Sequence, residues 1–184
     1  MILRYNTESK AWTHEAKAGE KLSFGFNKIS IAAASSDTLP ENSQQFLLQN
    51  NQGNIGPLVG ILTSMSKNMS LSGNGPLFQA LQEETLKLNG LIVVFPPETI
   101  VKDGLTGVIF LPTAQKWIPV KTPLPHLVFN RVPFRKAEQQ PAFKDAVNYL
   151  SALGIPFFNP GFINKNKLYS LFSRHPQLRK LMPE

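Results

Sequence analysis

The pattern of hydrophobic and polar positions along this chain changes near residue 50. Up to that point, apolar residues alternate with polar ones in short runs such as LRYN, KLSFGF and KISIAAA, separated by turn-rich pieces. A period of two is typical of half-buried strands, and frequent turns favour hairpins. The first part of the chain therefore predicts a small all-β unit, and no constellation in it suggests chemistry.

After residue 54, apolar runs alternate with amphipathic helical stretches. The runs PLVGILTS, LIVVFPP, PLPHLVFNRV and IPFFNP have the length and composition of buried strands in a parallel sheet. The first helix is expected to be capped by Asn74 and to end at Gly90, and the second to begin at Pro141. Strand, helix, strand, repeated, predicts an open, mostly parallel sheet with right-handed crossovers. The apolar residues expected on the two helix faces are Leu77, Ala80, Leu81 and Leu88, then Phe143, Ala146, Val147 and Leu150.

Two further features complete the predicted architecture. The stretch GVIFLPTAQKWIPVK alternates across a short turn and predicts an antiparallel hairpin from Gly107 to Lys121. The last strand runs into Asn159 and Pro160, which are expected to start a helix, and two short basic helical stretches follow. The fold class is therefore α/β, with three parts: a β-rich N-terminal subdomain (1–54), an α/β domain (55–162) and a basic helical linker (163–184).

Composition narrows the classes of function. The 184 residues are 42% hydrophobic and 17% charged, which is typical of a globular chain. The absence of cysteine excludes disulfides, thiolate catalysis and cysteine-ligated metals. His14, His126 and His175 have no metal-ligand spacing, and His126, beside Pro125 at a strand start, is expected to be structural. No apolar run approaches the roughly 20 residues needed to cross a bilayer, and no signal peptide is recognisable, so we expect a cytoplasmic chain without a transmembrane segment.

The formal net charge of +7 raises the question of an anionic partner. Specific nucleic-acid binding is disfavoured, because Tyr169 and Phe172 in the basic C-terminal stretch fit helix-core spacing rather than a stacking platform. A solvated helical face is the simplest interpretation, and a phosphate-bearing small ligand stays open. Much of the excess charge comes from Lys165, Lys167, Arg174, Arg179 and Lys180, which face only Glu184.

Ligands of open parallel sheets gather at the carboxyl ends of the strands. Four segments follow strands here: 63–76, 96–99, 130–136 and 159–165. The first has Gly73 and Gly75 at a helix start, where backbone amides can hold an anion. It lacks both the dinucleotide fingerprint and the nucleotide P-loop ending, so a plain connection and a substrate loop remain alternatives.

The segment NRVPFRK carries more chemistry. Asn130 and Arg131 come directly off a buried strand, and Arg135 and Lys136 follow within a turn, so these four groups are expected to converge. Guanidinium groups bind carboxylate or phosphate in a bidentate way, although Arg131 is equally compatible with pairing to a local carboxylate. Paired carboxylates, a Ser–His–Asp set and an HExxH motif are all absent from the sequence, so the chain by itself shows no catalytic machinery.

Four ordered segments resemble the YheC/YheD endospore coat-associated family of ATP-grasp-like proteins in spore-forming bacilli. They are GPLVGILTSMSKN, GNGPLFQALQEETLKLNGLIVVFPPETI, LPHLVFNRVPFRKAE and FFNPGFINKNKLYSLFSRHPQLRKLMPE. The resemblance covers roughly residues 55–184, whereas the first fifty or so residues match only as a short β-rich prelude. It implies that the α/β domain is a preATP-grasp domain of Rossmann-like type, placed before two lobes that hold ATP and magnesium.

The resemblance also implies roles for particular residues. In this family the FFNP strand leads into a helix that carries Asp-Lys and then into an LP-x-T step that opens the ATP-binding lobe. Lys165 matches the lysine, which would reach nucleotide phosphates, while Asn164 stands where the aspartate is usual. Asn130, Arg131 and, by position, Arg135 would bind the substrate. The sequence ends at LMPE, at the LP-x-T step, so we expect an N-terminal portion of a longer protein.

The resemblance implies that the full-length protein is an ATP-dependent carboxylate–amine ligase, in which this portion supplies the substrate side. Its partners would be the C-terminal ATP-grasp lobes and spore coat proteins. Catalytic residues and magnesium ligands would lie in those lobes, so this portion would not catalyse alone. The alternative is a non-enzymatic scaffold or binding module of the spore coat. A freestanding nucleotide-binding domain comes last, because the loop at Gly73 and Gly75 lacks the fingerprint.

Overall fold

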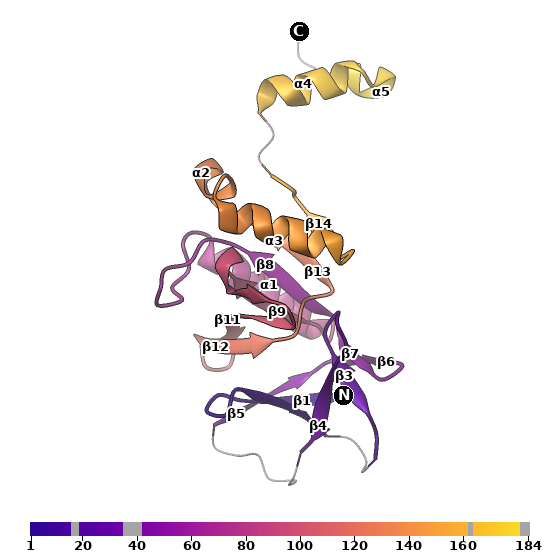
Figure 1. Ribbon diagram of the computed structural model, residues 1–184, viewed down its shortest axis with the longest axis vertical. Helices are drawn as coiled ribbons and strands as arrows, with labels where there is room; N and C mark the ends of the chain where they lie inside the picture. The colour runs from indigo at the N-terminus through magenta and orange to yellow at the C-terminus, as the bar shows by residue number, and fades with distance from the viewer. Residues whose placement is uncertain (16–18, 35–41, 162–163, 181–184) are drawn as a thin grey trace.

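The computed structural model describes residues 1–15, 19–34, 42–161 and 164–180, which form a mixed α/β fold with two sheets. Figure 1 shows the first sheet at one end of the molecule, the second sheet with its helices in the middle, and the last two helices at the other end. The β-rich beginning and the α/β middle follow the order that the hydrophobic pattern predicts. The first sheet extends to Gly56 and the second begins at Leu58.

The first sheet has the strand order β5-β1-β2-β4-β3-β7-β6 in the part of the chain that is described. Trp12 lies at the centre of its aromatic core, with ring centroids 4.7 Å from Tyr5, 5.1 Å from Phe24 and 5.8 Å from Phe46. The strands are β1 (Ile2–Asn6), β2 (Ala11–His14), β3 (Leu22–Phe24), β4 (Ile29–Ala33), β5 (Ser43–Leu47), β6 (Gln49–Asn51) and β7 (Asn54–Gly56).

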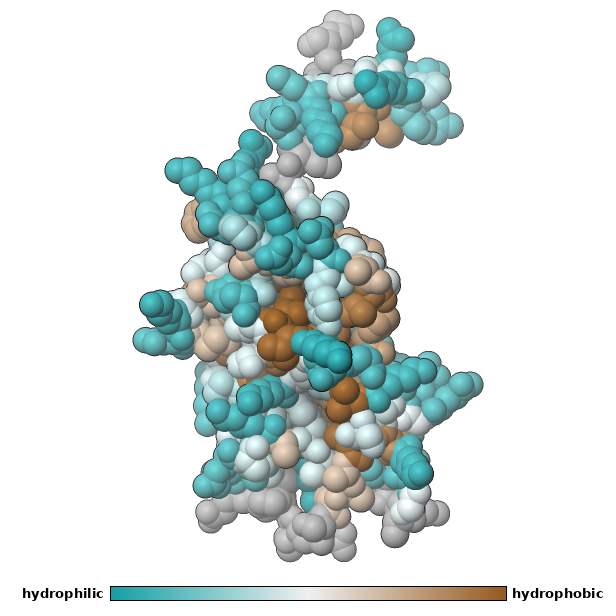
Figure 2. Space-filling view, viewed as in Figure 1, coloured by the Kyte–Doolittle hydropathy of each residue, from teal (hydrophilic) through white to brown (hydrophobic). Residues whose placement is uncertain are grey.

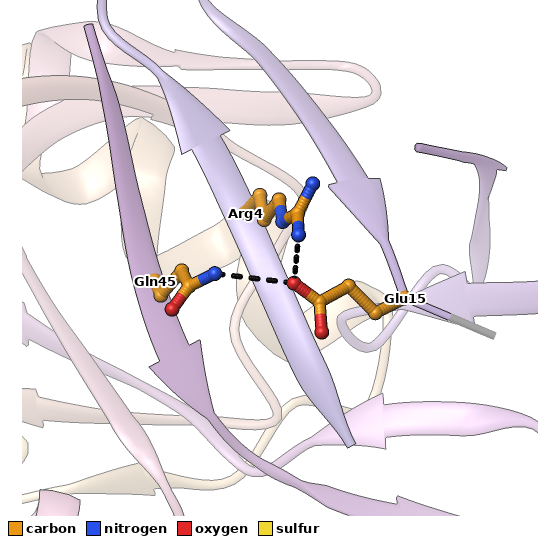
Figure 3. Close-up of polar contacts among 3 residues, drawn as sticks. All are labelled: Arg4, Glu15 and Gln45. Atoms are coloured by element: carbon orange, nitrogen blue, oxygen red, sulfur yellow. Dashed lines mark hydrogen bonds and ion pairs between the residues drawn. The ribbon is translucent and has the colours of Figure 1, made fainter. Parts of the chain in front are cut away.

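A buried charged residue joins three parts of this sheet (Figure 3). Arg4 on β1 has a side chain that is only 6% exposed, and its guanidinium pairs with the Glu15 carboxylate just after β2. The same Glu15 oxygen, Oε1, accepts a hydrogen bond from Gln45 Nε2 on β5 at 3.1 Å. Since β1 lies between β2 and β5, this contact ties the middle strand to both neighbours.

The second sheet has the order β10-β11-β9-β8-β13-β14, and β12 pairs with β11. β9, β8, β13 and β14 run parallel, as predicted, and the expected hairpin from Gly107 to Lys121 is confirmed as the antiparallel pair β11–β12. The strands are β8 (Leu58–Leu62), β9 (Leu91–Phe95), β10 (Ile100–Val101), β11 (Gly104–Leu111), β12 (Lys116–Thr122), β13 (Leu127–Asn130) and β14 (Phe157–Phe158), with a 3₁₀ turn η1 (Pro97–Thr99).

Two helices cover opposite faces of this sheet (Figure 1). Phe78 of α1 packs in one apolar cluster with Ile92 and Val94 of β9, whereas Leu150 of α3 belongs to the other cluster, together with Val93. Alternate residues of β9 therefore pack against helices on opposite faces of the sheet, as in a doubly wound arrangement. The helices are α1 (Gly75–Lys87), α2 (Arg135–Glu138), α3 (Pro141–Ala152), α4 (Lys165–Ser173) and α5 (Pro176–Arg179).

Details of the helices differ from the sequence-based expectation. α3 buries Phe143, Ala146 and Leu150 as predicted. In α1 the fully buried residues are Phe78 and Gln82, while Leu77 and Leu88 of the predicted face are 39% and 70% exposed. Gln82 is only 1% exposed, and its Oε1 accepts a hydrogen bond from Ile92 N at 3.1 Å, an interaction that helical spacing does not reveal.

Two expected helix caps are corrected by the structure. Asn74 precedes α1, but its side chain makes no capping hydrogen bond. Asn159 has a left-handed backbone, φ 53°, and the next described helix starts at Lys165 instead. The cap of that helix is Asn164, whose Oδ1 accepts a hydrogen bond from Lys167 N at 2.7 Å.

The two sheets share one continuous apolar core, and polar contacts fix the position of one sheet against the other at their joint. Trp12 Nε1 donates to Lys121 O at 2.6 Å, and Lys121 N donates to the Tyr5 hydroxyl at 3.2 Å. Asn27 Oδ1 accepts from Leu124 N at 3.1 Å. Burial raises the pKa of Tyr5, and the Lys121 amide partly offsets that effect. The first sheet is therefore packed against the second rather than attached by a flexible tether.

His126 provides a further contact at this joint, in agreement with the structural role expected for it. Its Nδ1 accepts a hydrogen bond from Leu58 N at 3.0 Å, at the start of β8. Its Nε2 lies 3.2 Å from the side-chain nitrogen of Asn54 on β7. Burial lowers the pKa of His126 below its usual 6.5, although the backbone contact with Leu58 acts in the opposite direction.

We expect Glu15→Gln to lower the free energy of unfolding by about 1–3 kcal/mol, because it removes the charge that compensates a buried guanidinium. Urea unfolding measures this loss. The control is Glu84→Gln, which removes a solvent-exposed pair with Lys87 and should leave stability nearly unchanged. Equal stability of Glu15→Gln and the parent chain would show that the buried Arg4 does not depend on the charge of Glu15.

We expect His126 to make stability depend on pH. The pKa of this ring is lower in the folded chain than in the unfolded chain, so the neutral ring favours the folded state. This contribution to the free energy of unfolding is fully present above pH 6.5 and is lost as pH falls through the lowered folded pKa. His126→Gln should flatten the decline of the unfolding free energy below pH 6.5, measured by urea titration at several pH values. His175→Gln, on the exposed end of the chain, should keep the decline of the parent chain.

Candidate functional site

A crevice opens where the order of the parallel strands reverses. β9 lies on one side of β8, and β13 on the other, so the connections after β8 and β13 leave in opposite directions. Open α/β sheets bind ligands at such a point, outside the carboxyl ends of the strands. A cavity of about 360 Å³ lies here, which we call the switch-point crevice. Its lining residues are Ser72, Gly73, Asn74, Arg131, Val132, Pro133 and Asn159.

Hydrogen bonds across three strands hold the floor of the switch-point crevice. Thr63, fully buried directly after β8, donates a hydrogen bond from its hydroxyl to Arg131 O at 3.2 Å. Arg131 N in turn donates to Leu62 O at 2.8 Å. Asn159 Nδ2 donates to Asn130 O at 2.9 Å, which ties the end of β14 to β13. The backbone that presents Arg131 is therefore fixed from both sides.

Arg131 lines the switch-point crevice with a half-buried side chain. Its guanidinium carbon lies 5.6 Å from the centroid of the Phe129 ring, two residues earlier on the same face of the strand. A cation–π contact orients the guanidinium but leaves its charge available. Within the described residues no carboxylate forms an ion pair with Arg131, so the alternative of local pairing finds no partner there.

Asn130 points to the opposite face and is only 1% exposed. Its Nδ2 donates to Glu138 Oε1 at 2.7 Å, and its Oδ1 accepts from Val132 N at 3.0 Å. Both ends of the amide are thus used inside the protein. The structure places Asn130 as a support for the loop between β13 and α2, rather than among the residues that line the crevice.

The expected convergence of four polar groups does not occur: Asn130 is buried, and the other three line two separate hollows. Arg135 and Lys136, at the start of α2, line a neighbouring hollow of about 680 Å³ together with the exposed ring of Phe134. Pro133 borders both hollows. Periodicity could not foresee this division, because the short helix α2 redirects the side chains that follow Pro133.

Lys165 is the first residue of α4 and does not line the switch-point crevice. Figure 1 shows α4 and α5 set apart from the second sheet, and every described residue of α4 is at least partly exposed. The helix that the sequence places after Asn159 and Pro160 thus begins only at Lys165. The structure therefore does not bring Lys165 together with Arg131.

Sequence reasoning missed two contributions to this site. Asn159 was expected to cap a helix, yet it lines the crevice with a left-handed backbone. An Asn before Pro after a short strand is a turn signal that could have identified it. Thr63 begins the strand-end segment 63–76, but the sequence does not indicate its contact with Arg131, which lies 68 positions away.

The switch-point crevice is suited to binding an anion. Its lining includes one guanidinium, two side-chain amides and a hydroxyl, and no carboxylate. Among the described residues, no three His, Asp or Glu side chains come close enough to hold a metal ion. No nucleophile–base pair occurs among the lining residues, so they can bind and orient a ligand but do not form a catalytic set.

Throughout the described residues, no helix has the length and hydrophobicity needed to cross a membrane.

Comparison with known proteins gives one informative similarity. No family model matches the sequence. No solved structure matches it either. The chain is 28% identical over 150 residues to the endospore coat-associated protein YheD of Bacillus subtilis (strain 168), an alignment that covers 79% of this chain and 33% of that relative. The chain thus spans about a third of the relative's length, and the similarity confirms its resemblance to the YheC/YheD endospore coat-associated proteins.

Proposed function

We propose that this chain is the N-terminal, substrate-side portion of an endospore coat-associated, ATP-grasp-like protein. In this proposal, the switch-point crevice binds the carboxylate or another anionic group of an acid substrate. The observation that carries the proposal is the position of Arg131, a cation without a carboxylate partner in the described chain, at the carboxyl ends of β8 and β13. The similarity to YheD supports the assignment to this group of proteins.

The arrangement of the second sheet supports the preATP-grasp part of the proposal. Four parallel strands in the order β9-β8-β13-β14, with α1 and α3 on opposite faces, are typical of a Rossmann-like domain. The first sheet meets the second where β8 and β13 begin, at the end opposite to the switch-point crevice (Figure 1).

Each polar residue near the crevice then has a distinct role. Arg131 binds the anionic group through its planar fork of N–H donors. Asn130, with its amide engaged by Glu138, is a positioning residue that holds the loop carrying Arg131. Arg135 lines the neighbouring hollow and would contact a second, more distant part of a larger substrate.

ATP and Mg²⁺ belong, in this proposal, to C-terminal lobes of a longer protein. The described residues contain no cluster that could hold a metal, so they do not fit Mg²⁺ by themselves. Lys165, at the start of α4, is the residue of this chain that we direct toward the nucleotide phosphates. ATP would supply the phosphoryl group that activates the substrate carboxylate for attack by an amine, which makes the full-length protein a carboxylate–amine ligase located in the cytoplasm and at the spore coat.

We expect Arg131→Glu to weaken binding of a carboxylic acid to the switch-point crevice by about 10- to 100-fold, as the loss of a charge-assisted hydrogen bond requires. A panel of mono- and dicarboxylic acids would be titrated against the isotope-labelled chain, with the amide signals of Gly73 and Asn159 as reporters. Arg174→Glu, at the exposed residue that follows α4, makes the same charge change and should leave the affinity unchanged.

In the intact protein, Arg131→Glu should also abolish ATP hydrolysis that depends on the acid found in this way. Unchanged affinity and unchanged hydrolysis would remove Arg131 from the substrate site and, with it, the proposed role of the crevice.

The second candidate function is a non-enzymatic scaffold of the spore coat. The similarity to an endospore coat-associated protein favours it, as does the cationic surface of the last two helices. Figure 2 shows hydrophilic side chains over most of α4 and α5, around one apolar patch. The exposed cations here include Lys167, Arg174 and Arg179, and the exposed apolar residues include Leu168 and Leu171.

This function predicts an association with acidic coat proteins that weakens with salt and does not depend on ATP. In pull-downs from sporulating-cell extract, replacing Lys167, Arg174 and Arg179 by Gln should reduce recovery of coat proteins. Replacing Lys102, Lys116 and Lys144, exposed elsewhere on the chain, provides the matched control. Recovery of no coat protein by the parent chain would eliminate the scaffold function.

A further inference from the structure

A second polar cavity lies at the opposite end of the second sheet, where β8 and β13 begin and the first sheet meets them. It has a volume of about 570 Å³, within the range of small-molecule sites. We call it the junction pocket, and the lining residues that matter here are Lys21, Ser23, Lys28, Gly53, Asn54 and His126. It shares no residue with the switch-point crevice.

The junction pocket is positively charged. Lys21 and Lys28 flank β3, one before it and one in the turn that leads to β4, and both line the pocket. No Asp or Glu is among the lining residues, and within the described chain neither lysine forms an ion pair. Glu20 precedes Lys21 in sequence but does not line the pocket. Two cations in one cavity, neither paired with a carboxylate of the described residues, favour an anion there.

Two hydrogen-bond donors meet in the wall of this pocket without an acceptor between them. His126 Nδ1 accepts from Leu58 N, so in the neutral ring the proton lies on Nε2. That Nε2 faces Asn54 Nδ2 at 3.2 Å, which is also a donor.

The amide of Asn54 cannot simply be reversed to relieve this mismatch. Its Nδ2 donates to Gly25 O at 3.2 Å, and its Oδ1 accepts from Ser23 Oγ at 3.1 Å. Reversal would turn the amide oxygen toward the Gly25 carbonyl oxygen, which has no proton to give. An oxygen atom of a ligand, placed in the pocket, would accept from both His126 and Asn54.

The position of the His126 ring depends on close contact with a glycine. A Cβ added at Gly56 would lie 2.7 Å from His126 Cε1, so a side chain at residue 56 would displace the ring. Gly56 therefore leaves the room that the ring occupies, and the hydrogen bond from Leu58 N to Nδ1 orients the ring before any ligand arrives, which lowers the entropic cost of binding.

We propose that the junction pocket binds the phosphate or carboxylate group of a small anionic ligand, between the ammonium groups of Lys21 and Lys28 and the N–H groups of His126 and Asn54. This site is independent of the proposed function, since it lies at the other end of the sheet. Its ligand would contact both sheets and stabilise their joint, because any ligand that binds only the folded state raises stability.

The test uses the isotope-labelled 184-residue chain and two probes, pyrophosphate and citrate, in separate titrations. We expect saturable changes in the ring nitrogen signals of His126 and the amide signals of Gly53 and Asn54, and none at Asn159 in the switch-point crevice. Tighter binding of pyrophosphate would assign the site to phosphate ligands, and tighter binding of citrate to carboxylate ligands.

Two double variants distinguish the loss of this site from a general effect of net charge on anion binding. Replacing both Lys21 and Lys28 by Gln should lower the affinity for the probe that binds more tightly by about tenfold, the order expected for losing a charge-assisted contact. Replacing Lys116 and Lys144, exposed on β12 and α3, changes the net charge equally and should leave affinity unchanged. The proposal would be overturned if both double variants lost the same affinity, or if neither probe gave a saturable change at His126.

Discussion

The rest of the structure depends on the complete burial of β9. All five residues from Leu91 to Phe95 are at most 3% exposed, so both faces of the central sheet require a cover. α1 supplies one cover, through Phe78. The other face is covered by α3 and, in the same apolar cluster, by the first sheet. Removal of this apolar surface from water is what holds the three layers together.

The shared cover explains why the first sheet has buried polar contacts at its joint. Once Tyr5 and Trp12 pack against the second sheet, their polar atoms need partners, and the backbone of Lys121 provides both. His126 meets the same requirement at the other side of the joint through Leu58 N. The polar contacts therefore fix how the two sheets meet, while the apolar core supplies the attraction.

The two ends of the parallel strands provide different surroundings for an anion. At the carboxyl ends, Arg131 rests on an aromatic ring in a crevice framed by three strands. At the amino ends, Lys21 and Lys28 border a cavity that Asn54 and His126 also line. Neither hollow is lined by a carboxylate, which agrees with a chain of formal net charge +7. The charge excess that the C-terminal helices display is thus also present at concave surfaces, where it can act on small ligands.

Local sequence determined the elements: the parallel strands, the β11–β12 hairpin, α1 and α3 follow from hydrophobic period and from Gly and Pro signals. It also identified the segment that contains Arg131. Tertiary structure alone decided that Asn130 faces inward to Glu138 while Arg131 faces the crevice, and that Lys165 lies apart from both. The physical reason is that side chains alternate between the two faces of a strand, but this alternation does not determine which face becomes buried. The residues that bury a face lie far away in the sequence.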